Sequence, residues 1–218
     1  MKFYAINGSP RKNKNTATLL QAALDGIRST GAEGAHETEM IHLYDINYQS
    51  CLSCFQCKRL GGKCYGKCAI NDDLTPLIER LSLADGIIFG SPIYYGNITG
   101  KMRSFFERLL FPFSVYDANF SSLAPRRMPT AFIYTMNVTE EMMGEWGYKQ
   151  NLADIEFFIG RTFSTPKILY GWNTYQFNDY SKYKMEYFSE ADKAAYRERQ
   201  FPLDCKQAFQ MGVEMAGA

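Results

Sequence analysis

The sequence has no long run of apolar residues, no excess of charge of either sign, and neither internal repeats nor a linker. A helix that crosses a bilayer needs about 20 mostly apolar residues, so a membrane partner is not expected. The net charge is +1, and the lysines and arginines are scattered along the chain. A nucleic-acid-binding face normally concentrates basic residues, so nucleic acid is not an expected partner either.

The start of the chain lacks the apolar h-region and small-residue cleavage site of a secretory signal, because a strand pattern begins at once with Lys2. We therefore expect a cytoplasmic protein. In that compartment the six cysteines are expected to be thiols or metal ligands rather than disulfides. His36 and His42 are the only histidines, and neither lies beside a carboxylate-rich or cysteine-rich segment. The sequence thus offers no catalytic histidine.

What the sequence does contain is an alternation of short apolar strand patterns and amphipathic helix patterns. Strands are expected at residues 2–6, 40–44, 85–90, 130–135 and 166–170. Helices are expected after Asn15-Thr16, over 74–81, 99–110 and 140–163, and from Pro202 onward. This order predicts an α/β fold, a doubly wound five-stranded parallel sheet with helices on both faces, in a single domain of residues 1–218. Ligands of such a sheet bind at the carboxyl ends of its strands.

The first loop at such an end joins the opening strand to the first helix and carries Ser9, Arg11, Asn15 and Thr16. A helix N-terminus presents free backbone N–H groups and the positive end of the helix dipole, so this loop suits a phosphate. It lacks the Lys-Ser/Thr ending of a P-loop and the three glycines of a dinucleotide fingerprint. The alternative is an ordinary turn in which Asn15 or Thr16 serves only as the helix cap.

A second loop, Gly90 to Gly100, follows the third strand. Its glycines allow close backbone approach, and its tyrosines offer flat faces for a planar ring. The residues expected to line that ring are Pro92, Ile93, Tyr94, Tyr95, Gly96 and Asn97. A ligand with a phosphate in the first loop and a heteroaromatic ring in the second is flavin mononucleotide (FMN). The alternative is a plain surface turn.

The two loops together carry a resemblance that neither carries alone. Gly8-Ser9-Pro10-Arg11…Asn15-Thr16, with Ser91 to Asn97 and then Lys101, Phe105 and Glu107-Arg108, resembles the NADPH-dependent FMN reductase branch of the flavodoxin-like proteins. Within that branch, Cys51-x2-Cys54-x2-Cys57…Cys68-x3-Asp72-Asp73 is similar to the iron–sulfur flavoproteins. The resemblance is close over residues 1–112 and beyond them extends only to the order of elements.

The resemblance implies a flavodoxin-like fold and noncovalent FMN, with Ser9, Arg11, Asn15 and Thr16 around the phosphate and Pro92 to Asn97 along the isoalloxazine ring. It also implies a homo-oligomer, in which a cluster can lie near the flavin of another subunit. Two departures stand out. The loop after the fourth strand, Thr135 to Glu140, is not glycine-rich as it usually is in the family, and the interval between Cys57 and Cys68 is long and holds an extra cysteine.

The cysteine loop holds Cys51, Cys54, Cys57, Cys64 and Cys68 within eighteen residues. Three thiolates at x2 intervals favour an iron–sulfur cluster of the [4Fe-4S] type, because zinc sites more often use two C-x2-C arms separated by a longer insert. Compact spacing favours Cys64 as the fourth ligand, whereas the resemblance favours Cys68. The alternative is a set of reduced thiols with no cluster.

The sequence therefore predicts an FMN-dependent oxidoreductase. Electrons are expected from NAD(P)H or a ferredoxin-like donor, and they are expected to pass to a small-molecule or protein acceptor (a flavin, a quinone or similar), with the cluster as an intermediate carrier. Because the flavin carries the chemistry, no catalytic side chain is expected. The alternative from another class is a non-enzymatic electron carrier or redox sensor that binds a metal, or keeps free thiols, in its cysteine loop.

Overall fold

The computed structural model describes residues 1–217, and its sheet has the strand order β2-β1-β3-β5-β6. All neighbours along that path are parallel, and the short β4 pairs antiparallel with β3. The strands are β1 (Lys2–Asn7), β2 (Glu37–His42), β3 (Gly86–Tyr94), β4 (Asn97–Ile98), β5 (Thr130–Thr135) and β6 (Lys167–Gly171). The prediction of five parallel strands is confirmed.

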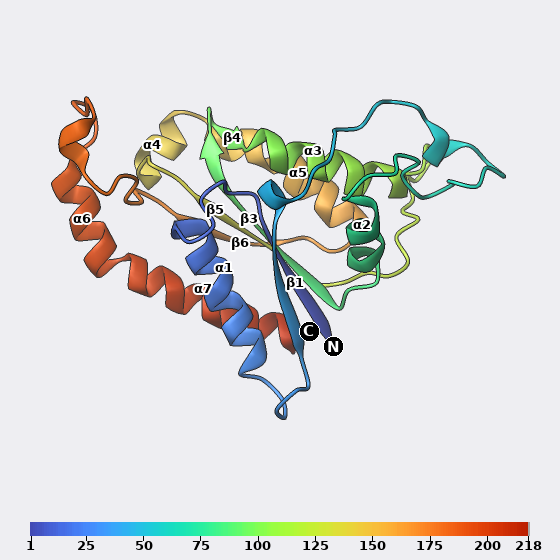
Figure 1. The fold of residues 1–218 in the computed structure, drawn as a ribbon, viewed down its shortest axis with the longest axis horizontal. Coiled ribbons are helices and arrows are strands. Elements are labelled where there is room, and N and C mark those ends of the chain that lie inside the picture. The colour runs from blue at the N-terminus through green and yellow to red at the C-terminus, as the bar shows by residue number, and fades with distance from the viewer. Residues whose placement is uncertain (218) are drawn as a thin grey trace.

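Helices cover both faces of this sheet (Figure 1). They are α1 (Asn15–Arg28), α2 (Thr75–Ser82), α3 (Gly100–Leu110), α4 (Glu140–Glu145), α5 (Tyr148–Thr162), α6 (Glu190–Arg199) and α7 (Phe201–Ala216). Short 3-10 turns lie at Leu43–Asp45, Gln56–Lys58, Phe111–Phe113 and Tyr180–Lys182. Within the described residues, no helix is long and apolar enough to cross a membrane.

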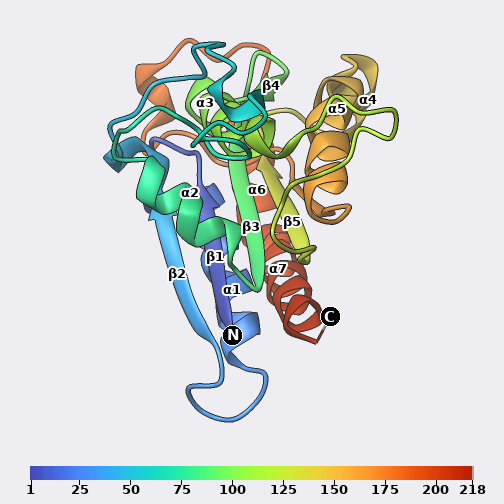
Figure 2. The ribbon, with the colours of Figure 1, turned by 90° about the vertical axis from the view of Figure 1, so that its right-hand side faces the viewer.

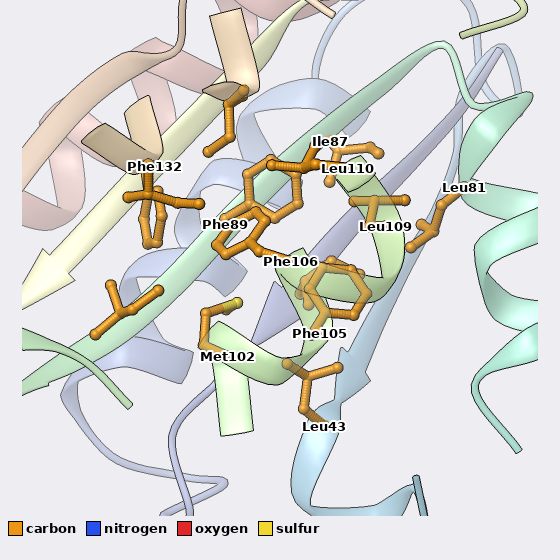
Figure 3. Packing of buried hydrophobic residues seen from close by; sticks show 14 of the residues in the cluster. Leu43, Leu81, Ile87, Phe89, Met102, Phe105, Phe106, Leu109, Leu110 and Phe132 are labelled. Atoms are coloured by element: carbon orange, nitrogen blue, oxygen red, sulfur yellow. The ribbon is translucent and has the colours of Figure 1, made fainter. Parts of the chain in front are cut away.

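Two hydrophobic cores form because successive strand side chains point to opposite faces. On β1, Phe3 and Ala5 pack toward α1 and α7, whereas Tyr4 and Ile6 pack toward α2 and α3. The second of these cores is rich in aromatic side chains (Figure 3), and Phe89 lies 4.9 Å from Phe106 between ring centroids. The strands are therefore apolar on both faces, as is expected of a covered parallel sheet.

The first and last helices cross in close contact on one face of the sheet. A Cβ added to Gly26 would lie 2.0 Å from the carbonyl oxygen of Phe209, and one added to Gly212 would lie 1.9 Å from that of Ala23. Each helix therefore needs a glycine where the other passes. The buried face of α7 includes Ala208, whereas Phe209 is 39% exposed.

The expected loop over residues 90–100 is mostly a hairpin, which corrects that prediction. β3 continues to Tyr94, and β4 returns antiparallel to it from Asn97. The two residues between them, Tyr95 and Gly96, have φ angles of 52° and 74°. Positive φ at both central residues is the geometry of a type I′ turn, whose twist matches that of the paired strands. The alternation of Ser91 to Tyr94 is too short to distinguish this hairpin from a loop.

Candidate functional site

The loops that follow β1, β2 and β3 leave the sheet at one edge, uppermost in Figure 2. Asn7, the last residue of β1, pairs with His42 of β2 and Gly90 of β3. Parallel strands place their carboxyl ends together, and the structure confirms that the three loops share this edge.

Thr99 joins the first loop to the β3–β4 hairpin. Its buried hydroxyl donates to the carbonyl oxygen of Gly8 (2.9 Å) and accepts the N–H of Met102 (3.2 Å), which caps α3. The N–H of Gly8 in turn donates to the carbonyl oxygen of Gly90 (2.8 Å). Sequence reasoning did not select Thr99, although a threonine just before a helix pattern is a typical N-cap signal. The two candidate flavin loops are thus one connected structure.

The N-terminus of α1 has no side-chain cap, and its N-cap residue is Lys14. The alternative in which Asn15 or Thr16 caps this helix is therefore wrong. By contrast, a threonine or serine side chain caps α3, α4 and α6, at Thr99, Thr139 and Ser189. The first N–H groups of a helix need acceptors, so the opening turn of α1 is suited to an anion.

The four side chains expected around a phosphate lie together in the first loop, but each one has a protein partner. Ser9 Oγ accepts the N–H of Arg11 (3.1 Å), and Thr16 Oγ1 lies 2.7 Å from Thr135 Oγ1. Arg11 Nη1 and Asn15 Nδ2 reach outward to carbonyl oxygens of the segment 175–176, at 2.5 and 2.9 Å. Sequence reasoning did not connect this segment with the loop.

The hairpin presents its tyrosines to solvent. The side chain of Tyr95 is fully exposed and that of Tyr94 is 46% exposed. Partial burial raises the pKa of Tyr94, and the neighbouring Tyr44 adds to the rise, whereas the positive charge of Arg11 opposes it. The Tyr94 ring therefore lies close enough to the first loop to sense Arg11. Gly96 is held from the other side, where Asn151 Nδ2 donates to its carbonyl oxygen (3.3 Å).

The loop that follows β5, residues 136–139, is tied to the chain that follows β6. Asn173 donates its N–H to Val138 (2.8 Å), and Lys193 Nζ donates to Asn137 O and Asn173 Oδ1 (2.7 and 2.8 Å). Lys193 is fully buried, and burial lowers the pKa of its amine to about 8. Lysine side chains are normally exposed, and Lys193 is an exception.

These features fit a flavin phosphate and ring in this chain. An uncapped helix N-terminus lies beside Arg11, a basic side chain, and a hairpin bearing two exposed tyrosines adjoins the same loop. Backbone N–H groups and a guanidinium suit a phosphate, and aromatic faces suit a planar heterocycle. The redox chemistry of a flavin enzyme is supplied by the cofactor itself.

The cysteine loop runs along α3 from its N-terminal half to its C-terminal end. Lys101 Nζ donates to Ile46 O (2.9 Å), the N–H of Cys51 donates to Glu107 Oε2 (3.3 Å), and Arg108 Nε donates to Cys68 Sγ (2.9 Å). Successive contacts thus follow the helix axis (Figure 1). The thiols lie at the opposite end of α3 from Thr99.

All six cysteines are free, and Cys57 is the buried one. Burial is the main cause that raises the pKa of the Cys57 thiol; negative charge on Cys68, Cys51 and Cys54 raises it further, and Lys58 opposes. Within residues 1–217, however, no three cysteine, histidine or acidic side chains converge closely enough to hold a metal ion.

Two non-glycine residues of the cysteine loop have a left-handed backbone conformation. Ser53 and Phe55, which flank Cys54, have φ angles of 51° and 54°. Left-handed conformations are unfavourable for residues with a side chain, by about 1–2 kcal/mol each, so the loop holds strain in the C-x2-C-x2-C run. The three thiols of this run, with Cys64 or Cys68 as a fourth, fit the ligand set of an iron–sulfur cluster in kind, although their sulfurs do not converge here.

Comparison with known proteins identifies the family. The sequence profile described as NADPH-dependent FMN reductase matches residues 1–133. The chain belongs to this family. An iron–sulfur flavoprotein of Methanocaldococcus jannaschii is 39% identical over 108 residues, covering 50% of this chain and 51% of that protein. One of Archaeoglobus fulgidus is 37% identical over 108 residues, covering 50% and 48%. In these alignments the chain spans about half the length of each relative.

A solved NAD(P)H:quinone oxidoreductase from Methanothermobacter marburgensis has the same fold as this member of the FMN reductase family. It superposes with a TM-score of 0.70 over 98% of both chains, at 15% sequence identity. Likeness at that identity concerns the fold alone. The strand order with β1 between β2 and β3 is that of the flavodoxin-like doubly wound sheet, so the predicted fold class is confirmed.

Proposed function

We propose that the chain is an FMN-dependent oxidoreductase that takes electrons from NAD(P)H or a ferredoxin-like donor and passes them to a small-molecule or protein acceptor, such as a flavin or a quinone. The observation that carries this proposal is the pair of loops joined by Thr99 beside the uncapped N-terminus of α1. Membership of the NADPH-dependent FMN reductase family supports it.

In the proposed site, backbone N–H groups at the start of α1 hold the phosphate, together with Ser9, Arg11, Asn15 and Thr16. In this proposal Arg11 and Asn15 exchange their present acceptors, the carbonyl oxygens of residues 175–176, for oxygens of the phosphate. The span Pro92 to Asn97 lines the ring. When bound, FMN supplies both two-electron exchange with a nicotinamide and one-electron exchange with a metal centre.

We propose further that Cys51, Cys54, Cys57 and Cys68 hold a [4Fe-4S] cluster, which supplies one-electron transfer. Support comes from the contacts of Cys51 and Cys68 with neighbouring residues of α3, because the N–H of Cys51 donates to Glu107 Oε2 (3.3 Å) and Arg108 Nε donates to Cys68 Sγ (2.9 Å). Cys64, the alternative fourth ligand, lies on the turn in which its carbonyl oxygen accepts the N–H of Lys67 (2.8 Å). Side-chain rotation within the loop is needed before the thiols converge.

The proposal includes one domain and a homo-oligomeric assembly. Phe157 and Phe158 on α5 are 58% and 51% exposed, and Phe120 beside them is 60% exposed. Clustered exposed aromatic side chains are typical of contact surfaces. Light scattering of purified protein measures the assembly directly, and a mass of one chain at working concentrations would contradict this part of the proposal.

The decisive experiment is purification without oxygen followed by an absorption spectrum, flavin analysis, and iron and acid-labile sulfide assays. We expect one FMN and about four iron and four sulfide per chain. Steady-state oxidation of NAD(P)H then tests the enzyme assignment, because a carrier or sensor would cycle by single electrons with slow turnover. Protein that binds no flavin after reconstitution would refute the proposed function. Flavin-loaded protein without iron would leave a simple flavin reductase.

A further inference from the structure

Arg108 is a fully buried arginine at the C-terminal end of α3, beside the cysteine loop. Its guanidinium has five N–H donors, and five hydrogen bonds extend from it. Nε donates to Cys68 Sγ (2.9 Å); Nη1 donates to Gln49 O (3.0 Å) and Asp72 Oδ2 (2.8 Å); Nη2 donates to Ile70 O (3.4 Å) and Asp72 Oδ1 (3.0 Å).

Arg108 forms an ion pair with Asp72 and also donates three hydrogen bonds to other groups. A buried arginine needs a carboxylate to offset the cost of removing its charge from water, and Asp72 fills that role. The other three bonds go to groups on both ends of the cysteine loop: Gln49 precedes Cys51, while Cys68 and Ile70 lie where the loop leaves. One side chain therefore closes the loop at its base.

The Asp72 carboxylate is adapted to this arrangement. Burial alone would raise its pKa, but the hydrogen bonds and charge of Arg108, together with the N–H groups of Gln49 and Leu74, hold the pKa below its ordinary value. The carboxylate thus stays ionised and fixes the plane of the guanidinium. The remaining N–H groups are aimed by that plane at Cys68 and the two carbonyl oxygens.

We propose that Arg108 is a positioning residue for the cysteine loop, which selects Cys68 over Cys64 as the fourth cluster ligand and raises the reduction potential of the cluster. This inference rests on the proposed cluster. An N–H group that donates to a ligating sulfur withdraws electron density from it, so the reduced cluster is stabilised. Cys64 has no comparable donor among the hydrogen bonds found in residues 1–217.

Arg108 and Thr99 lie at opposite ends of α3, so the helix fixes the distance between the groups to which they are bonded. Thr99, which is bonded to the flavin loop, and Arg108, which is bonded to the cysteine loop, are separated by nine positions, or roughly 14 Å along a helix. The same rigid helix therefore sets the position of both candidate redox sites within the chain. Loss of Arg108 therefore releases the cysteine loop and leaves the flavin loop in place.

The test compares Arg108→Lys with Arg103→Lys, a matched control on the same helix. Arg103 is exposed and pairs with Glu107 at 3.9 Å. Lysine keeps the charge at position 108 but has no planar fork. The protein is FMN-loaded and made without oxygen, and three quantities are measured: hydrogen exchange of amides 49–72, loss of iron to a chelator, and the midpoint potentials of cluster and flavin.

We expect Arg108→Lys to keep FMN, to exchange faster at both ends of the loop, and to lose iron about tenfold faster or more. Its cluster potential falls while its flavin potential stays the same, a split that a general loss of stability would not produce. Arg103→Lys behaves as the parent in all three measurements. A variant at 108 that matches the parent in exchange, iron retention and cluster potential would overturn the inference.

Two further outcomes remain informative. If the parent protein contains no iron, the proposed cluster fails, and hydrogen exchange alone then decides whether Arg108 closes the loop: unchanged exchange in Arg108→Lys refutes it. If Arg108→Lys does not bind FMN, the double variant Asp72→Asn with Arg108→Met removes the sulfur donor without leaving a buried carboxylate unpaired. Parent-like iron retention in that protein would also refute the inference.

Discussion

The two ends of α3 are built in different ways. At its N-terminus, the flavin end, backbone groups dominate: Gly8, Gly90 and the cap residue Thr99 connect two loops through bonds of 2.8 to 3.2 Å. At its C-terminus, the cysteine end, a single charged side chain, Arg108, makes five bonds: two to Asp72 and three to the two ends of the cysteine loop. Backbone bonds follow from the fold itself, whereas a side-chain clamp depends on one residue. The flavin end is therefore expected to tolerate substitution better than the cysteine end.

Cys54→Ala should have the largest effect, and that effect should be confined to the cysteine end of α3. Cluster ligation needs each thiolate of the C-x2-C-x2-C run, so we expect iron and sulfide to be lost while FMN remains at parent occupancy. Iron, sulfide and flavin assays on anaerobic protein measure this. Cys205→Ala, outside the loop on α7, is the control and should keep its iron. Full iron content in Cys54→Ala would remove Cys54 from the ligand set.

Thr99→Val tests the flavin end. The substitution removes a helix cap, at about 1 kcal/mol, and leaves the carbonyl of Gly8 without its donor, at about 1–3 kcal/mol. We expect the free energy of unfolding to fall by about 2–4 kcal/mol and FMN to bind more weakly. Thr139→Val is the matched control, because Thr139 caps α4 by accepting the N–H of Met142 (3.3 Å) and makes no bond to Gly8. Equal losses in both variants, in urea unfolding, would contradict the connecting role of Thr99.

Lys193 should make the stability of the loop after β5 depend on alkaline pH. Its folded pKa, about 8, lies below its ordinary value of 10.5, so the unfolded chain binds more protons between those pH values. The free energy of unfolding should therefore rise as pH increases from 8 to 10.5, by roughly 1–3 kcal/mol from this residue. Lys193→Met should lack that rise. Urea unfolding of parent and variant at several pH values measures the difference, and parallel pH curves would rule out a depressed pKa.

Arg11→Ala should weaken FMN about tenfold, because a charge-assisted bond to phosphate contributes roughly 1.5 kcal/mol or more. Riboflavin, which has no phosphate, should bind as before. Lys12→Ala is the control on the same loop, since Lys12 pairs with Asp45 at 2.5 Å instead. Fluorescence titration of both flavins gives the affinities. Equal loss for FMN and riboflavin in Arg11→Ala would place the phosphate elsewhere.

Tyr95→Asn should have the smallest effect on stability, and in the favourable direction. Tyr95 has a φ of 52° in the type I′ turn, and asparagine adopts this conformation more readily than tyrosine does. We expect the free energy of unfolding to rise by about 0.5–1 kcal/mol. If the ring of Tyr95 covers the flavin, riboflavin and FMN will both bind more weakly. Greater stability with unchanged flavin affinity would show that Tyr95 is only a turn residue.

The strands and the shared edge of the three loops could be predicted because both follow from local patterns. β1 and β5 each show buried residues on successive positions bounded by turn residues, and the placement of loops at one edge follows from parallel strands. The hairpin was not predicted because one of its two turn residues is Tyr95, and tyrosine rarely adopts the positive φ that this turn requires.

The remaining features of the site depend on distant contacts. Arg11 and Asn15 contact a segment some 160 residues away, and no local pattern pairs such residues. Arg108 and Lys193 have charged side chains, which are expected at the surface, yet both are fully buried. Only the complete set of partners around each one explains its burial. Glu107-Arg108 is part of the motif that carries the family resemblance, but the motif does not indicate the bonds that Arg108 makes.

The close crossing of α1 and α7 has a consequence for biosynthesis. The first helix emerges from the ribosome early, but the backbone surface around Gly26 receives its partner only when Gly212 and the rest of α7 have been synthesised. Until then, one face of α1 remains uncovered, and so does the core that it shares with β1 and β3. The phosphate loop is attached to the start of that helix. We therefore expect that FMN is loaded only after α7 has been synthesised, and that a truncation that removes α7 yields protein without flavin, however intact its loops are.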